Sequence, residues 1–129
     1  MRGSYFLLFD YLNFDLTGMT DKKIKFTLPQ IKCIYQQLLN GLIYLHDVKN
    51  LAHRDIKGAN ILLDRKGKVQ IADFGLARML SPNNPNKMYT TRVVTLWFRA
   101  PELLIGFKNY TFSVDIWSMA CVFAELVTG

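Results

Sequence analysis

The chain has 129 residues, half of them hydrophobic and 20% charged, a composition typical of one globular domain with a sizeable core. Its formal charge of +6 could attract nucleic acid or an acidic partner. The basic residues are scattered, however, and no run exceeds the pair Lys22-Lys23, so we expect no direct nucleic-acid binding. We expect no membrane span either, because the longest apolar stretch, 116–127, is too short and contains Ser118 and Glu125.

Cys33 and Cys121 lack the CxxC spacing of metal or redox motifs. Both lie in segments with helical periodicity, so we expect buried, reduced thiols, as in a cytosolic or nuclear protein. The N-terminus does not read as a secretory signal, because Asp10 interrupts its apolar run.

The first element in chain order is the aromatic and aliphatic run Tyr5-Phe6-Leu7-Leu8-Phe9, which predicts a buried strand. The residues that follow, 10–16, predict a turn that leads away from it. On the residues alone, a plain core strand and turn explain this region without any binding role.

The next predicted element is a helix of roughly twenty residues. Thr27 is the expected N-cap, and Gln30 completes a capping box. Apolar residues then recur at spacings of three and four as far as Leu45, which predicts a packed face. We expect His46, at the end of this helix, to be a helix-terminal residue and not a catalyst.

The segment His53-Arg54-Asp55-Ile56-Lys57-Gly58-Ala59-Asn60 has the pattern H-R-D-x-x-x-x-N. It is followed by Ile61-Leu62-Leu63 and Lys68-Val69-Gln70-Ile71, which flank a glycine-containing turn and predict a hairpin. Asp73-Phe74-Gly75 comes directly after that hairpin. The hairpin would return Asn60 and Asp73 to one site.

This constellation suits phosphoryl transfer to a hydroxyl. Asp55 can accept the hydroxyl proton, Lys57 can face a phosphate, and Asn60 and Asp73 are oxygen ligands of the kind that Mg²⁺ prefers. A single aspartate would be read as a turn residue, but the ordered set favours the chemical interpretation. We expect His53 to be a core histidine and not an acid or base.

Two more segments complete the chain. The polar loop 81–87 contains two prolines, and Ser113 to Val127 predicts a helix that is apolar on nearly every face. Asp115 is then a carboxylate in apolar surroundings, which needs partners. A helix-terminal carboxylate favoured by the macrodipole explains it almost as well.

With these motifs the chain resembles a eukaryotic protein kinase over nearly all of its length. Residues 88–102 are similar to the cyclin-dependent kinase pattern YTxxVVTLWYRAPE, with Phe98 in place of Tyr. The start of the chain and residues 25–33 look closest to the transcription-elongation branch. The resemblance implies an α+β, protein-kinase-like fold, mostly the helical large lobe with the hinge strand, truncated at both ends. Residues 1–129 would form one partial kinase domain, from the hinge to the buried helix after the activation segment, without a second domain.

The resemblance also implies a site for ATP and Mg²⁺. Phe9 would be the gatekeeper, Asp10 and Leu12 would belong to the hinge that pairs with adenine, and Leu62 would lie under the ring as an apolar floor. Asp115 would accept backbone N–H groups near His53. The catalytic residues would be Asp55, Lys57, Asn60 and Asp73, with Asn60 and Asp73 as the metal ligands.

The resemblance implies regulation and specificity for the activation segment, residues 73–102. Thr90 matches the activating threonine, and Arg54 and Arg78 are the arginines that would hold its phosphate. Thr95 would bond to Asp55 and Lys57. The pocket for a proline after the target residue would be formed by Val93, Thr95, Leu96 and Arg99.

The function implied is a proline-directed serine/threonine kinase fragment that acts on Ser/Thr-Pro sites, with the tail of RNA polymerase II as a candidate substrate. It would work with a cyclin-type subunit in the nucleus, or alternatively in the cytoplasm, without direct nucleic-acid or membrane binding. The chain contains no GxGxxG loop and no V-A-I-K-type lysine. These 129 residues alone are therefore expected to be inactive, and a non-catalytic pseudokinase remnant or interaction module is the alternative.

Overall fold

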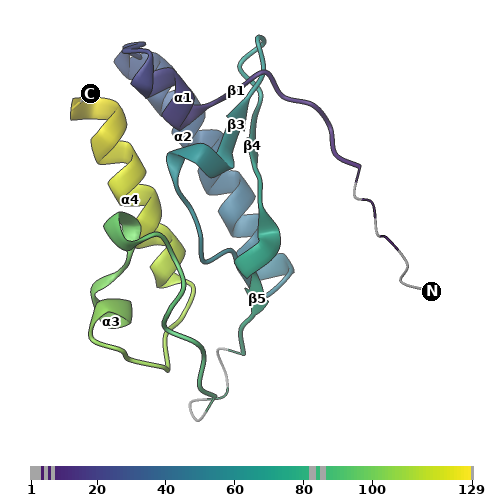
Figure 1. Ribbon diagram of the computed structural model, residues 1–129, viewed down its shortest axis with the longest axis vertical. Coiled ribbons are helices and arrows are strands. Elements are labelled where there is room, and N and C mark those ends of the chain that lie inside the picture. Colours follow the sequence, from purple (N-terminus) through teal and green to yellow (C-terminus); the bar gives the residue numbers. More distant parts are fainter. Residues whose placement is uncertain (1–3, 5, 7, 82–83, 85–86, 129) are drawn as a thin grey trace.

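The computed structural model describes residues 4, 6, 8–81, 84 and 87–128. Two long helices, α2 (Leu28–Ile43) and α4 (Ser113–Thr128), pack against one another, and the strands and the loops between them lie alongside (Figure 1). The ring of Tyr35 on α2 meets Phe123 on α4 edge-on at 4.9 Å, and its hydroxyl donates to the carbonyl of Met119. The core therefore lies between these helices and the segments that cross them.

The strands form two small antiparallel sheets. In the first, β3 (Ile61–Leu63) lies between β1 (Phe14–Asp15) and β4 (Val69–Ile71). In the second, β2 (Leu51–Ala52) pairs with β5 (Arg78–Met79). The predicted hairpin is confirmed, with Gly67 at φ +82° in the turn that glycine favours.

Short helical elements complete the chain. These are α1 (Leu16–Asp21), the π-helix η1 (Tyr44–Val48), the 3-10 turns η2 (Gly58–Asn60), η3 (Phe74–Leu76) and η4 (Leu96–Phe98), and α3 (Pro101–Leu104). The sequence analysis did not predict α1, whose N-cap is Asp15, with a carboxylate that accepts from Gly18 N–H at 2.7 Å. The signal was an Asx cap followed by only six helical residues, too short to give an apolar period.

The long central helix begins as predicted. Gln30 Oε1 accepts from the Thr27 backbone N–H at 2.8 Å, as a capping box requires. The α-helix ends at Ile43 and continues as η1, which is wider. His46 lies in this π-turn and is buried, so its position at the helix end is confirmed.

Three predictions of burial were wrong. Residues 6 and 8–10 form no strand and are exposed, with Leu8 at 99%, and they extend away from the body (Figure 1). Tyr5 and Leu7 of that predicted strand lie outside the described residues. A strand needs a neighbour to take its backbone hydrogen bonds, and none of the described segments pairs with this one.

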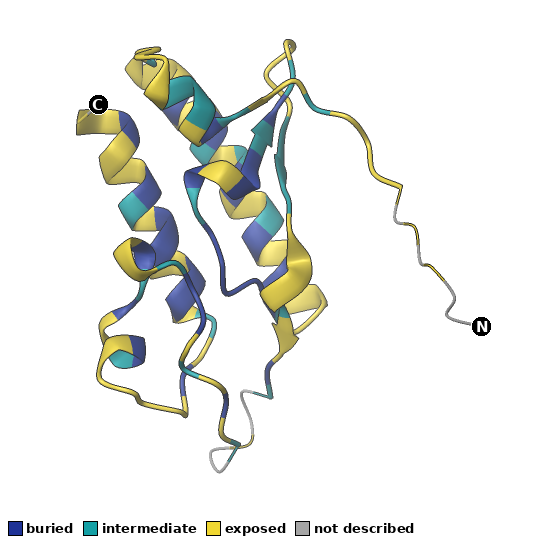
Figure 2. Cartoon of the chain, in the orientation of Figure 1, coloured by how far each residue is buried: buried dark blue, intermediate teal, exposed yellow. Residues whose placement is uncertain are grey.

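The other two errors concern the helices. On α4, Val114, Met119 and Val122 are buried, whereas Trp117 and Phe123 are 46% and 39% exposed, so the helix buries one face only (Figure 2). Cys33 is exposed and Cys121 is half-buried against the core. Both are free thiols, as expected.

Candidate active site

The hairpin brings Asn60 and Asp73 to one place. In β3 and β4, Ile61 lies opposite Ile71, and the next pair is joined by a hydrogen bond from Ala72 N–H to the Asn60 carbonyl, 2.8 Å long. Asn60 and Asp73 therefore flank the open end of the same ladder. Asp73 has a left-handed backbone, φ 60°, and its Oδ1 accepts from Gly75 N–H at 3.1 Å.

Asp55 is the centre of a hydrogen-bond network. Its Oδ2 accepts from Lys57 Nζ at 2.8 Å and from Asn60 Nδ2 at 3.1 Å. Its Oδ1 accepts from the Thr95 N–H at 3.2 Å and from the Thr95 hydroxyl at 3.1 Å. Lys57 Nζ also donates to Thr95 Oγ1 at 3.2 Å. The structure thus brings Asp55, Lys57, Asn60 and Thr95 together, and the bonds of Thr95 to Asp55 and Lys57 are those that the family resemblance implied.

These contacts hold Asp55 as a carboxylate. Burial by itself raises the pKa of the Asp55 carboxyl. The hydrogen bonds from Lys57 and Thr95 and the positive charge of Lys57 act the other way, and the net pKa lies below the ordinary value. Asp55 is therefore ionised at neutral pH and can accept a hydrogen bond from an incoming hydroxyl.

A buried carboxylate on α4 holds the backbone of this loop. Asp115 is fully buried and accepts from the backbone N–H groups of His53 and Arg54, each at 2.8 Å. Its Oδ2 also lies 2.8 Å from His46 Nε2. The bonds expected for Asp115 are thus present. Arg54 has φ +64°, a conformation that costs a non-glycine residue free energy and that these bonds stabilise.

The His53 ring supports the backbone of Asp55 through a hydrogen bond. Its Nδ1 accepts from the Asp55 backbone N–H at 3.2 Å, and Nε2 lies 2.9 Å from the Ala72 carbonyl, a pair that requires a neutral ring with the proton on Nε2. Burial lowers the pKa of His53, and the Ala72 carbonyl and nearby carboxylates only partly oppose this. The ring meets Phe74 edge-on at 4.9 Å.

The activation segment contains a strained residue that the sequence analysis missed. Val94 has φ +65°, which is rare for a β-branched residue. Arg99 donates from Nε to the Val93 carbonyl and from Nη2 to the Val94 carbonyl, both at 3.0 Å. Val93 is buried and Leu96 is 55% exposed. Among Val, Thr and Leu at these positions, the sequence gives no signal for a positive φ.

Thr90 and the predicted phosphate-binding arginines are brought together only in part. Arg54 donates from Nη1 to the Tyr110 hydroxyl at 2.9 Å, and that hydroxyl donates to the Thr90 carbonyl at 2.7 Å. Arg78 is exposed on β5 and makes no hydrogen bond to Thr90 in the described part of the chain. The sequence analysis did not identify Tyr110, which no motif marks.

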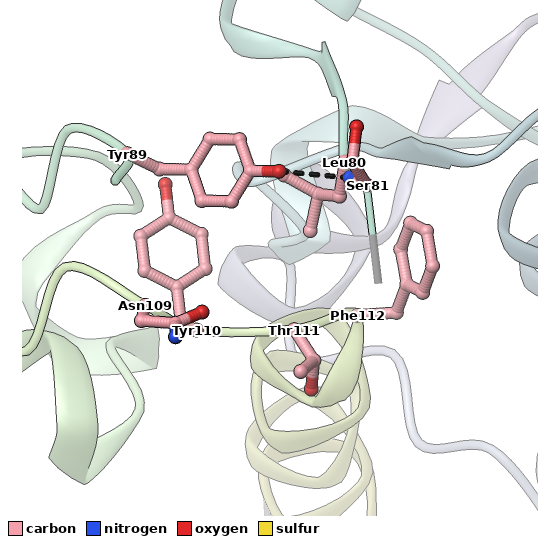
Figure 3. A pocket seen from close by; sticks show the side chains of 7 residues that line it. All are labelled: Leu80, Ser81, Tyr89, Asn109, Tyr110, Thr111 and Phe112. Atoms are coloured by element: carbon pink, nitrogen blue, oxygen red, sulfur yellow. Dashed lines mark hydrogen bonds between the residues drawn. The ribbon is translucent and has the colours of Figure 1, made fainter. Parts of the chain in front are cut away.

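A small hollow of about 20 Å³ lies beside Tyr110 (Figure 3). Leu80, Ser81, Tyr89 and Phe112 are among the residues that line it. This volume holds about one water molecule, so the hollow is too small for a nucleotide.

The residues predicted to bind the nucleotide do not converge. Phe9 is 77% exposed, and Asp10 and Leu12 lie in irregular chain. Leu62, half-buried in β3, pairs with Asp15 and Gln70 instead. A larger cavity of about 150 Å³ lies between β1 and α1, and none of the four lines it.

The donor set at the end of the hairpin fits a hard cation. Asn60 Nδ2 donates to the Asp55 carbonyl at 2.8 Å and to its carboxylate, so the amide oxygen remains for a ligand. Asp73 directly follows Ala72, whose N–H bonds to the Asn60 carbonyl. Among the described residues no three His, Cys, Asp or Glu side chains form a metal cluster. In the same part of the chain, no helix is long and apolar enough to cross a bilayer.

Comparison with known proteins gives consistent results. The family description "Protein kinase domain" matches residues 2–129. Cyclin-dependent kinase C-1 of Oryza sativa subsp. japonica is 51% identical over 99% of the chain, which covers 24% of that protein. Cyclin-dependent kinase 9 of Danio rerio is 48% identical over 98% of the chain, which covers 34% of that protein.

A solved structure agrees in fold. The crystal structure of the yeast RNA Pol II CTD kinase CTDK-1 complex contains a chain that matches with a TM-score of 0.83 and 46% identity. The match covers 91% of this chain and 38% of that one. The expected kinase-like fold is confirmed, and the chain spans about a quarter of the length of the first curated relatives it matches.

Proposed function

The chain belongs to the protein kinase family, among relatives that are cyclin-dependent kinases, and from this premise we propose that it forms the catalytic centre of a proline-directed serine/threonine kinase. Residues 1–129 act in this proposal as one partial kinase domain that transfers the γ-phosphate of ATP. The observation that carries the proposal is the Asp55 carboxylate, held ionised by Lys57 and Thr95.

Each residue around Asp55 has one task. Asp55 accepts a hydrogen bond from the substrate hydroxyl and orients its oxygen for attack on the γ-phosphorus. It takes up the proton as the new oxygen–phosphorus bond forms, while the bond from the γ-phosphorus to the β–γ bridging oxygen breaks and ADP leaves. Lys57 places a positive charge next to this carboxylate, where charge builds up on the transferred phosphoryl oxygens. Thr95 fixes Asp55 through two hydrogen bonds to Oδ1.

Asn60 and Asp73 would hold Mg²⁺, which neutralises charge on the phosphates when bound. The support is chemical and local: both offer oxygen atoms, and the ladder of β3 and β4 sets them side by side. The hydrogen bonds from Asn60 Nδ2 to Asp55 leave its oxygen available for the ion.

We propose that Val94 and Arg99 create a preference for proline after the target residue. The Val94 carbonyl already accepts a hydrogen bond from Arg99, and in this proposal it does not accept one from the substrate. An ordinary residue after the target would leave its backbone N–H without a partner, at a cost, whereas proline has no N–H. Val93, Thr95 and Leu96 would line the same pocket.

Phosphorylation of Thr90 is the proposed switch. Thr90 is exposed and so can be modified. The Tyr110 hydroxyl bridges Arg54 and the Thr90 carbonyl. A phosphate adds about −1.5 to −2 charge and would pair with Arg54. Arg78 would join only after a change in its side-chain position.

The remaining parts of the proposal rest on the relatives. A cyclin-type subunit is the proposed partner because the relatives are cyclin-dependent kinases. The tail of RNA polymerase II is the proposed substrate, because the similar solved complex is a kinase that acts on it. A nuclear location follows from that substrate, with the cytoplasm as the alternative. Phe9, Asp10, Leu12 and Leu62 would contact ATP once the segment 8–12 packs against a neighbour.

The competing function is a non-catalytic interaction module. Its support is that residues 8–11 are exposed, which leaves Leu62 without the expected adenine-binding partners. A pure scaffold, however, has no need for the network around Asp55.

The test compares transfer with binding. The natural full-length product that carries these residues would be incubated with Mg²⁺, γ-labelled ATP and two peptides that differ only as Ser-Pro and Ser-Ala. We expect Mg²⁺-dependent labelling of the Ser-Pro peptide, with much less labelling of the other. Nucleotide or partner binding without labelling of either peptide would support the interaction module instead.

A further inference from the structure

Tyr110 connects Arg54 to Thr90 without any phosphate. Its side chain is 3% exposed, and its hydroxyl accepts from Arg54 Nη1 and donates to the Thr90 carbonyl. Arg54 also donates from Nε to the Leu76 carbonyl at 2.8 Å. The Tyr110 hydroxyl therefore bridges the Arg54 side chain and the backbone of Thr90, the residue proposed to be phosphorylated.

A second tyrosine holds the other side of the same segment. Tyr89 is 5% exposed, its backbone N–H donates to the Lys108 carbonyl at 2.8 Å, and its hydroxyl accepts from the Ser81 N–H at 2.8 Å (Figure 3). The Tyr89 and Tyr110 rings contact each other with centroids 5.5 Å apart. The two hydroxyls have different partners: Tyr89 bonds within the activation segment, and only Tyr110 reaches Arg54.

We infer that Tyr110 is a positioning residue that presents Arg54 to a phosphate on Thr90. The inference rests on the proposed switch at Thr90. Tyr110 fixes the Arg54 guanidinium through Nη1 and leaves the Nη2 protons available. The same hydroxyl holds the Thr90 backbone at a set distance from the guanidinium. The phosphate then forms its ion pair with groups that are already ordered, so less conformational entropy is lost when the pair forms.

The matched test uses Tyr110→Phe and Tyr89→Phe, which each remove one buried hydroxyl from neighbouring rings. The 129-residue chain would be made with phosphothreonine at position 90, and the phosphate would be titrated by ³¹P NMR. In the wild type we expect the phosphate to ionise below its ordinary second pKa of about 6, because Arg54 favours the dianion. Tyr110→Phe should return the titration toward that ordinary value, whereas Tyr89→Phe should leave it unchanged.

Two results would overturn the inference: an unchanged titration in Tyr110→Phe, or an equal change in Tyr89→Phe, since either means that Tyr110 only fills space. If Tyr110→Phe does not fold, wild-type chain labelled with ¹³Cζ-tyrosine gives a second measurement. Phosphorylation of Thr90 should shift the Tyr110 signal strongly and the Tyr89 signal little; similar shifts of both would contradict the inference.

Kinetics of the full-length protein separate this inference from the proposed function. If both hold, Thr90 phosphorylation raises kcat/KM, and Tyr110→Phe lowers that gain about tenfold, the usual scale of a hydrogen bond to a charged group, with a smaller effect on the unphosphorylated protein. If phosphorylation does not change the activity but the ³¹P titration still depends on Tyr110, the proposed switch fails and the positioning role stands.

Discussion

The loop around Asp55 and the segment 8–12 would serve the same reaction, yet they differ in what holds them. Asp55, Asn60 and His53 are buried and bonded to groups within the chain, whereas Leu8 and Phe9 are 99% and 77% exposed. A loop that makes its own hydrogen bonds keeps its geometry from local contacts. A segment with mostly apolar side chains and an unpaired backbone gets its geometry from a neighbour.

The largest expected effect concerns the centre of the ordered region. Replacing Asp55 by Asn in the full-length protein should lower the rate of phosphoryl transfer by about 10²- to 10⁴-fold, the usual contribution of a general base, and leave ATP affinity nearly unchanged. Single-turnover assays measure the rate of transfer, and nucleotide titration measures the ATP affinity. Asp64→Asn, which changes an aspartate that bonds only to turn amides, is the control. Full activity in Asp55→Asn would refute the assigned role.

The next effect concerns the support beneath Asp55. Asp115→Ala removes the acceptor of the His53 and Arg54 N–H groups, and each buried donor left unpaired costs about 1–3 kcal/mol. We expect the free energy of unfolding, measured with urea, to fall by roughly 2–5 kcal/mol. Asp47→Ala, at an exposed position, should change it by less than about 0.5 kcal/mol. Similar losses in both variants would mean that Asp115 does not support the loop.

A smaller effect concerns specificity. Arg99→Met frees the Val93 and Val94 carbonyls, so that the N–H of a residue other than proline finds an acceptor. The ratio of kcat/KM for Ser-Pro and Ser-Ala peptides should fall about tenfold, as expected for one hydrogen bond. Arg92→Met, which changes an exposed arginine nearby, should keep the ratio. An unchanged ratio in Arg99→Met would exclude this account of the pocket.

The pH dependence of the unfolding free energy tests whether His53 is buried and neutral in the folded chain. Burial lowers the pKa of His53 below its ordinary 6.5, so the unfolded chain takes up a proton more readily than the folded one. His53 should therefore make the fold less stable as the pH falls through about 6.5, and the loss should level off below the folded pKa. NMR of the ring should show His53 neutral at pH 6.5. A His53 ring that is mostly protonated at pH 6.5 would contradict a neutral ring that accepts a hydrogen bond from the Asp55 N–H.

The smallest effect is expected in the exposed segment. Leu8→Ser should change the free energy of unfolding by less than about 0.5 kcal/mol, because the side chain is 99% exposed. Leu38→Ala, at a position that is 2% exposed on α2, should cost about 2–5 kcal/mol. A large loss in Leu8→Ser would show that residues 8–12 pack against the body after all.

Sequence reasoning succeeded where local chemistry decides the structure. The capping residues of α2 and the hairpin were predicted from residue types and spacing, whereas the bonds of Thr95 to Asp55 and Lys57 were expected only from the family resemblance. It failed where the outcome depends on neighbours: the run 5–9 is apolar in any context, and no pattern tells whether a strand will pair with it.

Two other residues escaped prediction for different reasons. Val94 has a positive φ, and Arg99 donates a hydrogen bond to its carbonyl, a contact between residues that no sequence period links. Tyr110 acts through its hydroxyl on Arg54, which lies 56 positions earlier. Such contacts are set by the packing of whole segments, which residue spacing does not encode.

The contrast between the two regions can be measured directly by hydrogen exchange on the 129-residue chain. We predict strong protection of the His53 and Arg54 amides, which bond to Asp115, and exchange at the rate of an unfolded peptide for residues 8–12. Fast exchange of the His53 and Arg54 amides, or protection of residues 8–12 equal to theirs, would contradict the view that the loop around Asp55 is held by this chain's own contacts.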